Sequence, residues 1–138
     1  HLALMHQAGF ECWNHALLVT MLQKVLPDGF FVIEHLASGA LTATAMATHH
    51  PQEWAPYGAE LGWVAADAAH KGHGLGMAVS TAATIRLMRG GYRNIYLLTD
   101  DFRLPAIKSY LRIGYRPDWF TGGMAERWQA VLARLGQP

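Results

Sequence analysis

The sequence predicts a mixed α/β fold in which a single layer of sheet carries helices on both sides. Apolar residues recur at helical spacing in several stretches, and β-forming runs lie between those stretches. Clusters of glycine and proline separate the two kinds of segment, as they do in compact domains built from short elements. The resulting order of elements is α-β-β-β-α-β-α-β-α.

The first half of the chain predicts one helix followed by three strands. Residues 10–26 show apolar side chains at helical spacing, and Pro27-Asp28-Gly29 is expected to end that helix. The predicted strands cover residues 30–36, 40–48 and 60–66. Residues 37–39, Ala-Ser-Gly, suit a hairpin turn between the first two strands. Residues 49–58, rich in His, Pro and Gly, are expected to form a loop.

The second half alternates predicted helices with shorter strands. The first predicted helix covers residues 75–88. The second has Pro105 in its first turn and runs to about residue 113, and the third covers residues 124–135. The predicted strands cover residues 94–99 and 115–120. Gly90-Gly91 and Gly114 are typical of helix ends, and Pro105 suits a first helical turn. Asp100 and Asp101 are placed to cap or complement the helix that follows them.

Composition restricts the classes of protein to which the chain can belong. Its 138 residues, 51% hydrophobic and 15% charged, are typical of one globular domain over residues 1–138. A formal net charge of +1 provides no basic field for nucleic acid. No apolar stretch approaches the roughly 20 residues that span a bilayer, and no secretory signal is visible. The single Cys12 forms no internal disulfide, so a cytoplasmic protein is expected.

Residues 70–77, His-Lys-Gly-His-Gly-Leu-Gly-Met, join the third predicted strand to the next helix and contain three alternating glycines. Glycines leave backbone amides unobstructed, and a helix N-terminus adds about half a positive charge. This combination favours a phosphate or pyrophosphate, and the alternative is a glycine-rich turn without a ligand. The glycine spacing does not fit a Rossmann fingerprint, and no P-loop sequence occurs.

Two separated pieces of the chain resemble the GNAT N-acetyltransferase superfamily. The first is Glu60-Leu-Gly-Trp-Val-Ala followed by Lys71-x-x-Gly74-x-Gly76, similar to the family's Arg/Gln-x-x-Gly-x-Gly/Ala loop after a strand. The second is Ala106-Ile-Lys-Ser-Tyr110-Leu-Arg-Ile-Gly114-Tyr115-Arg-Pro117, similar to its Ala-x-x-x-Tyr-x-x-x-Gly-Phe/Tyr helix and strand. The resemblance implies a mixed, mostly antiparallel central sheet flanked by helices.

The resemblance also implies that acetyl-CoA is the co-substrate. Loop amides would hold the pyrophosphate, and free amides of the preceding strand would hold the pantetheine. One strand amide would polarise the thioester carbonyl, an effect worth roughly 3 kcal/mol. The family often has Asn where this chain has Arg103, so one polar contact to coenzyme A is expected to change. The residues implied to bind the cofactor are Trp63, Val64, Ala65, Lys71, Gly72, His73, Gly74, Leu75, Gly76, Met77 and Arg103.

Two residues match catalytic positions of the family. Tyr110 matches the general acid that protonates the departing thiolate; the alternative is a core tyrosine, since Ile107 and Gly114 share its helix face. Glu60 occupies a strand position where family members carry a general base acting through water; the alternative is a solvated glutamate. No metal is expected, because the pairs His49-His50 and His70-x-x-His73 lack carboxylate or thiol partners at ligand spacing.

We therefore expect an enzyme that transfers an acetyl group from acetyl-CoA to a primary amine, by direct attack in a ternary complex. The acceptor would be a small-molecule or peptide amine. Glu60, Asp100 and Asp101 favour a cationic one, and the loop 49–58 would form a wall of its pocket. The alternatives are a non-catalytic acyl-CoA-binding module, half of a larger two-domain acetyltransferase, and a nucleotide-phosphate binder unrelated to coenzyme A.

The N-terminal end departs from the family. The usual first strand and one of two N-terminal helices are not recognisable before residue 10, and residues 2–5 are too short to supply either. Either the chain is N-terminally trimmed, or a partner completes the sheet, as in a homodimer.

Overall fold

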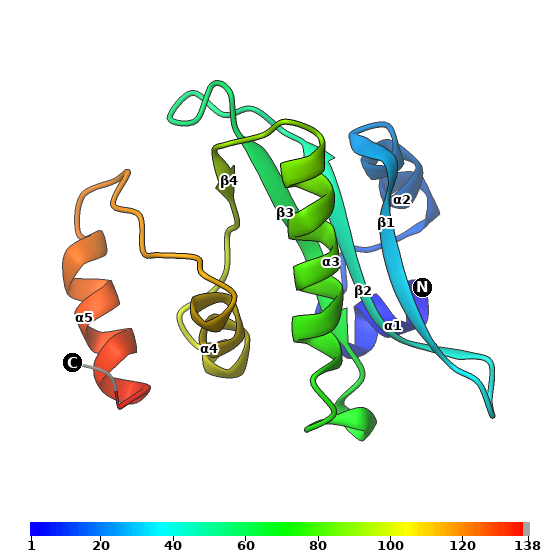
Figure 1. Cartoon of the computed structure of the whole chain (residues 1–138). Coiled ribbons are helices and arrows are strands. Elements are labelled where there is room, and N and C mark those ends of the chain that lie inside the picture. Colours follow the sequence, from blue (N-terminus) through cyan, green and yellow to red (C-terminus); the bar gives the residue numbers. More distant parts are fainter. Residues whose placement is uncertain (137–138) are drawn as a thin grey trace. The chain divides into compact units, whose positions relative to one another are not determined.

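The computed structural model describes residues 1–136, which form two compact units (Figure 1). The first unit covers residues 1–97 and holds the sheet, and the second begins at Leu98. The single domain over residues 1–138 stays a prediction. None of the helices in residues 1–136 is long and apolar enough to cross a membrane.

The first unit contains one four-stranded sheet in the order β1-β2-β3-β4. Its strands are β1 (Val25–His35), β2 (Ala40–His49), β3 (Ala59–Ala66) and β4 (Ile95–Tyr96). The β1–β2 and β2–β3 pairs are antiparallel, and the β3–β4 pair is parallel. This confirms the predicted mixed, mostly antiparallel sheet flanked by helices.

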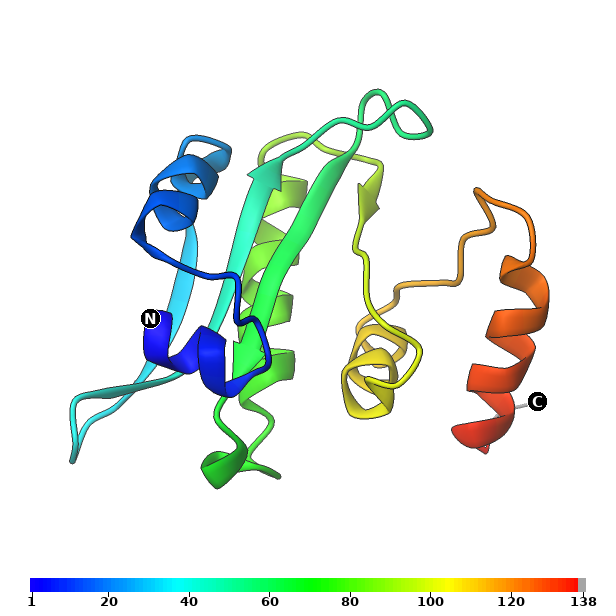
Figure 2. The same ribbon diagram turned by 180° about the vertical axis from the view of Figure 1, so that it is seen from behind.

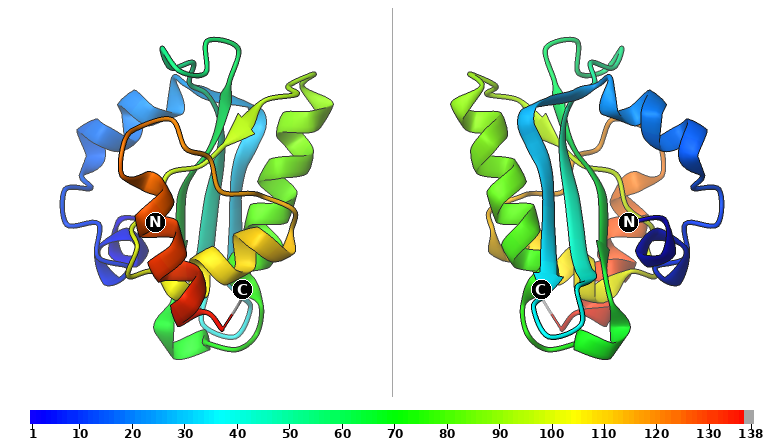
Figure 3. Two further views of the ribbon diagram at one scale, coloured as in Figure 1. Left: turned by 90° about the vertical axis from the view of Figure 1, so that its left-hand side faces the viewer. Right: turned by 90° about the vertical axis from the view of Figure 1, so that its right-hand side faces the viewer.

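Helices cover both faces of this sheet, as the edge-on views in Figure 3 show. They are α1 (Leu2–Gln7), α2 (His15–Leu22) and α3 (Leu75–Arg89). Helix α3 packs on one face of β1, β2 and β3, and α1 contacts β2 and β3 from the other face, which is nearer the viewer in Figure 2. Strand β2 is accordingly buried along nearly its whole length. Its small alanines, Ala43, Ala45 and Ala47, are fully buried and alternate with larger residues, so α3 can approach closely.

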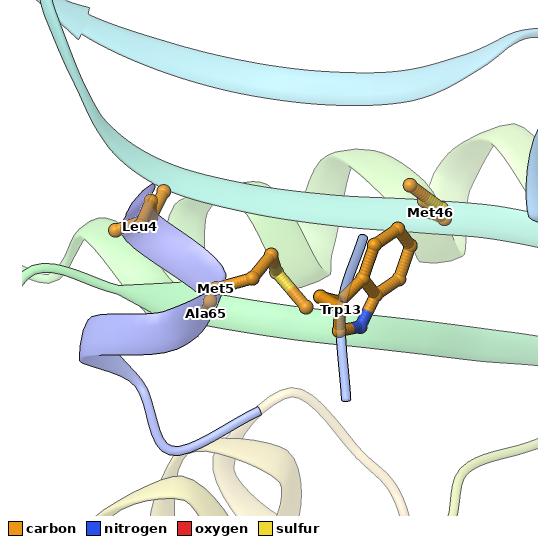
Figure 4. Close-up of a cluster of buried hydrophobic side chains, with 5 residues drawn as sticks. All are labelled: Leu4, Met5, Trp13, Met46 and Ala65. Atoms are coloured by element: carbon orange, nitrogen blue, oxygen red, sulfur yellow. The ribbon is translucent and has the colours of Figure 1, made fainter. Parts of the chain in front are cut away.

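The core between the N-terminal helices and the sheet gathers around Trp13 (Figure 4). Trp13 is 1% exposed and packs with Leu4, Met5, Met46 and Ala65. Burying a side chain of this size is one of the largest single contributions that a small domain can make to its stability. Residues near the chain's start are therefore structural members of the sheet's core.

The N-terminal region differs from the sequence prediction. Residues 2–7 form α1, where no helix was recognisable, and the predicted helix 10–26 shrinks to α2. Helix α2 begins at His15 because the Asn14 side chain accepts the Leu17 N–H at 2.9 Å. Phe10 and Trp13 therefore lie in the connection before α2 rather than within a helix.

The segment Pro27-Asp28-Gly29 was predicted to end a helix but lies inside β1. The register of β1 on β2 shifts between Val25 and Phe30, and Asp28 has a φ of 55°. Proline and glycine are tolerated in strands at such irregularities. A glycine is required at position 29 because the backbone comes close to it: a Cβ there would lie 2.7 Å from the Leu26 carbonyl oxygen.

The predicted central segments are confirmed within one residue: strands 40–48 and 60–66 and helix 75–88 correspond to β2, β3 and α3. The predicted strand 94–99 is shortened to β4. The predicted strand 115–120 is wrong, since those residues have no regular secondary structure.

The second unit contains α4 (Leu104–Arg112) and α5 (Met124–Arg134), both of which were predicted. Pro105 lies in the first turn of α4, as expected. The two aspartates do not cap α4, which begins without a side-chain cap. Instead, Asp100 accepts from Arg103 at 2.9 Å, and Asp101 accepts two hydrogen bonds from Arg127 of α5.

Candidate functional site

Strand β3 extends beyond the end of its parallel neighbour. β4 pairs with β3 only through Ala59↔Ile95 and Glu60↔Tyr96. Within the first unit, β3 from Leu61 to Ala66 therefore pairs with β2 alone. A strand edge of this kind presents backbone N–H and C=O groups that an extended ligand can pair with.

A β-bulge interrupts this part of β3. Thr44 pairs with Ala65 and Met46 with Gly62, so two residues, Trp63 and Val64, stand opposite Ala45. Trp63 has a φ of 52°, a left-handed conformation that is rare for a bulky residue. Bulges leave one residue outside the ladder and redirect its backbone, and a conformation of this kind costs about 1–3 kcal/mol. The strain marks β3 at Trp63 as a position that the surrounding structure holds in place.

Aromatic packing holds Trp63 in this conformation. The Trp63 ring lies edge-to-face with Trp13, at a centroid distance of 4.8 Å, and with Phe10, at 5.6 Å. Sequence reasoning assigned Phe10 and Trp13 to the apolar stripe of a helix and missed this role. The residues are far from Trp63 in sequence, and only the tertiary fold brings them together.

The glycine-rich loop after β3 has the expected backbone. Gly72 and Gly74 have φ values of 91° and 72°, which favour glycine, and a Cβ on either would meet nothing within 4 Å. Gly74 precedes α3 without any side-chain cap, and the helical ladder begins with the Ala78 N–H donating to the Gly74 carbonyl. The backbone N–H groups that precede this bond belong to Leu75, Gly76 and Met77.

Basic side chains surround the same loop. Lys71 and His73 are exposed, and the His73 ring lies 3.1 Å from the His70 carbonyl. Asp67 accepts from the Ala69 backbone N–H and from the His70 ring, both at 2.9 Å, which lowers the pKa of its carboxyl group. The loop therefore combines the backbone N–H groups at the uncapped start of α3 with the Lys71 ammonium group, which together suit an anion. Within residues 1–136, no group of three or more His, Cys, Asp or Glu side chains is placed to hold a metal ion.

Glu60, the predicted base, lies at the point where β3 and β4 part, and it is not simply solvated. Its side chain is only 17% exposed, and its Oε2 accepts from His50 Nδ1 at 2.5 Å. The other ring nitrogen of His50 lies 3.0 Å from Gln52 Nε2. Sequence reasoning treated His50 as a loop histidine. The signal that could have found it is the β2–β3 hairpin register, in which Thr48 faces Glu60.

Tyr96 completes this group from β4. Its hydroxyl donates to the His50 carbonyl at 2.5 Å, and burial, together with the Glu60 charge, raises its pKa. Trp54, from the loop 49–58, packs edge-to-face on Tyr96 at 4.6 Å, whereas Tyr57 is exposed. The loop 49–58, predicted to form a wall of the acceptor pocket, therefore contributes Trp54 to the packing on Tyr96.

Tyr110 and Arg103, the remaining predicted site residues, belong to the second unit. Tyr110 is buried on α4, and burial raises its pKa to about 12, with Arg103 opposing the change. Its phenol is therefore neutral near pH 7 and able to donate a hydrogen bond. Arg103 donates to Asp100 and lies over the Phe102 ring, 5.4 Å from its centroid.

Comparisons with known proteins give a family match and a set of similar folds. The model of the Acetyltransferase (GNAT) family matches residues 2–115, a range that contains β3, the glycine loop and α4. No curated protein sequence matches the chain.

Solved structures with a similar fold include several acetyltransferases. An acetyltransferase from Trypanosoma brucei has a TM-score of 0.64 and 18% identity, over 88% of this chain and 87% of that one. The ribosomal-protein-S18-alanine N-acetyltransferase from Escherichia coli has a TM-score of 0.63 and 17% identity, over 85% and 70% of the two chains. An aminoglycoside acetyltransferase from an uncultured soil metagenomic sample, in complex with sisomicin, has a TM-score of 0.59 and 17% identity, over 87% and 81%.

Proposed function

Since the chain belongs to the GNAT acetyltransferase family, we propose that it transfers an acetyl group from acetyl-CoA to a primary amine. One observation carries the proposal: the unpaired edge of β3, with its bulge at Trp63, leads through the glycine loop into the uncapped start of α3. The edge suits an amide-bearing chain, and the helix start suits a pyrophosphate. Coenzyme A contains both groups in that order.

The cofactor would be bound mainly by backbone. The N–H groups of Leu75, Gly76 and Met77 would hold the pyrophosphate, with Lys71 adding charge from the loop. The pantetheine amides would pair with the edge of β3 between Leu61 and Ala66, a length of about 20 Å at the usual rise per residue.

The bulge at Trp63 would place a backbone N–H at the thioester carbonyl. Attack by the amine nitrogen on the carbonyl carbon puts negative charge on the oxygen, and a donor fixed beforehand stabilises that charge by roughly 3 kcal/mol. Collapse of this intermediate forms the amide, breaks the C–S bond and releases the coenzyme A thiolate. The amine proton passes to the pair formed by Glu60 and His50.

Tyr110 would act on the leaving thiolate. A phenol whose pKa is about 12 is a weaker acid than a thiol, whose ordinary pKa is about 8.5. The thiolate is therefore too weak a base to remove the proton from Tyr110 fully. Tyr110 would stabilise the thiolate as a hydrogen-bond donor, and the thiolate would take its proton from solvent.

Release of free thiol from acetyl-CoA in the presence of amines tests the proposal. The amines would include small amines, amino acids, aminoglycosides and peptides with a free N-terminal alanine, because acetyltransferases named for the last two acceptors share the fold. We expect release that depends on one of these amines. Tight binding of acetyl-CoA by calorimetry without any amine-dependent release would instead identify an acyl-CoA-binding module.

A further inference from the structure

We propose that His50, positioned by Glu60, is the group that takes the proton from the attacking amine. The proposal rests on the proposed function, because it assigns the proton that an amine acceptor loses when it attacks acetyl-CoA. It assigns the proton transfer to an imidazole in the loop after β2 and gives the carboxylate on β3 a positioning role.

The contacts of the His50 ring define which nitrogen is basic. An ionised carboxylate can only accept, so the 2.5 Å contact with Glu60 Oε2 places the proton on His50 Nδ1. His50 Nε2 then carries the lone pair, and the Gln52 amide donates to it at 3.0 Å. A carboxylate behind one ring nitrogen fixes the tautomer and stabilises the imidazolium that forms when the other nitrogen is protonated.

Gln52 can accommodate both states of the ring. In the neutral state its NH₂ group faces His50 Nε2. Once that nitrogen holds the amine proton it becomes a donor, and rotation of the Gln52 amide by half a turn presents a carbonyl oxygen to it. The incoming amine can also displace Gln52, whose contact with the ring is made by a side chain and not by the backbone.

Exposure also favours the imidazole over the carboxylate. The His50 side chain is 35% exposed, twice the 17% of Glu60. The Glu60 side chain lies over Gly62, where a Cβ would be 3.7 Å from its carboxyl carbon. The carboxylate is therefore held against the strand, with one oxygen engaged by His50, and the imidazole is the part of the pair that an acceptor can reach.

The backbone at His50 is fixed at the point where the two strands separate. Tyr96 donates to the His50 carbonyl, and Tyr96 is the residue of β4 that pairs with Glu60. Within the first unit, the titratable groups that face His50 are thus Glu60 from β3 and Tyr96 from β4. Glu60 precedes the bulge at Trp63 by three residues, about 10 Å along a strand, so the pair and the bulge lie on the same strand.

The test compares pH profiles of kcat/KM for His50→Gln and Glu60→Gln, with His49→Gln as the matched control. His49 is the neighbouring histidine, but its ring lies 2.6 Å from the Tyr92 hydroxyl and takes no part in the pair. We expect His50→Gln to lower kcat/KM by about 100-fold or more and to abolish the acid limb of the profile. Glu60→Gln should lower kcat/KM by about tenfold and keep the acid limb, and Glu60→Asp should recover part of that loss. The control should match the parent.

A second measurement does not depend on the glutamine variants being well folded. Free imidazole should raise the rate of His50→Ala and leave the rates of His49→Ala and the parent unchanged, because it supplies only the missing base. If the parent releases thiol with an amine but His50→Gln keeps the acid limb while Glu60→Gln loses it, the inference alone is wrong and Glu60 is the base. If the parent releases no thiol with any amine, the proposed function fails and this inference fails with it.

Discussion

Trp63 is the residue at which strain, packing and the proposed chemistry coincide. Its left-handed conformation costs free energy, and the rings of Trp13 and Phe10 hold it from the side of the N-terminal helices. The side chain is thereby used for packing, and the proposed function assigns the backbone N–H at the bulge to the thioester carbonyl oxygen. Position 63 therefore matters for its backbone geometry, and residues distant in sequence determine that geometry.

Replacement of Trp13 by leucine should loosen the bulge. The substitution removes an aromatic edge contact and leaves a partly filled core, so we expect a loss of about 1–3 kcal/mol in the free energy of unfolding. We also expect kcat to fall about tenfold, with little change in the KM for acetyl-CoA, because a carbonyl donor is disturbed and the pyrophosphate site is not. Leu22→Ala, at an exposed position of α2, is the control. An unchanged kcat in a destabilised Trp13→Leu protein would contradict the link between packing and catalysis.

Removal of the Tyr110 hydroxyl should affect turnover and not binding. We expect Tyr110→Phe to bind acetyl-CoA with parent affinity by calorimetry and to lower kcat by about 10- to 100-fold, since stabilisation of the departing thiolate is lost. Lys108→Ala, at an exposed position of the same helix, provides the comparison. Equal turnover by Tyr110→Phe and the parent would leave Tyr110 as a core residue only.

The raised pKa of Tyr110 also predicts a change in stability at high pH. Burial raises this pKa from 10 to about 12, so the folded protein favours the protonated phenol. The associated stabilisation is complete below pH 10 and is lost as the pH rises through about 12, and it amounts to about 3 kcal/mol at most. The free energy of unfolding of the parent, measured by chemical denaturation, should therefore fall over this pH range by more than that of Tyr110→Phe. An equal fall in the free energy of unfolding of the two proteins would show that the Tyr110 phenol is not held neutral by burial.

At the scale of elements, the connection from β3 through the glycine loop to α3 is the part of the site built most plainly by local chemistry. Gly72 and Gly74 take conformations that other residues rarely adopt, while Gly76 lies in the first turn of the helix in an ordinary conformation. The three glycines thus have different reasons for being there. The backbone conformation requires two of them, and the third leaves free space above the first turn.

Alanine substitutions separate these reasons. Gly74→Ala should lower the free energy of unfolding by about 1–2 kcal/mol, because an L-residue at its φ of 72° is strained, and should weaken acetyl-CoA binding by distorting the helix start. Gly76→Ala is its matched control. A Cβ there makes ordinary contact with Ala66 at 3.8 Å, so stability should rise by about 0.5–1 kcal/mol. Denaturant unfolding and calorimetry check both, and equal binding by the two variants would contradict a role for the loop conformation.

The elements differ in how well the sequence alone predicts them, and the reasons are physical. β2, β3 and α3 show clear hydrophobic periodicity and are flanked by glycine or proline residues, and their bounds are predicted within one residue. The Pro-Asp-Gly segment was misread because the same residues that end helices also make irregularities in strands. Glu60 and the glycine loop were identified from local sequence, whereas His50 depends on hairpin register and the Trp13–Trp63 contact on tertiary packing.

At the scale of the whole molecule, the chain combines a sheet-bearing unit and a helical unit, and the family match over residues 2–115 includes parts of both. The first unit contains the features that would bind acetyl-CoA along β3 and α3, together with the pair of His50 and Glu60. The second unit contains Tyr110, whose phenol is buried and neutral near pH 7. The central claim is that acetyl-CoA binds along the free edge of β3 and at the start of α3.

Amide hydrogen exchange with and without acetyl-CoA tests that claim most directly. Backbone amides from Trp63 to Ala66 and from Leu75 to Met77 should exchange more slowly when the cofactor is bound, and both segments should respond over the same concentration range. Amides of β1, on the far side of β2, serve as the internal control and should not change. Tight binding of acetyl-CoA without protection of these two segments would contradict the account.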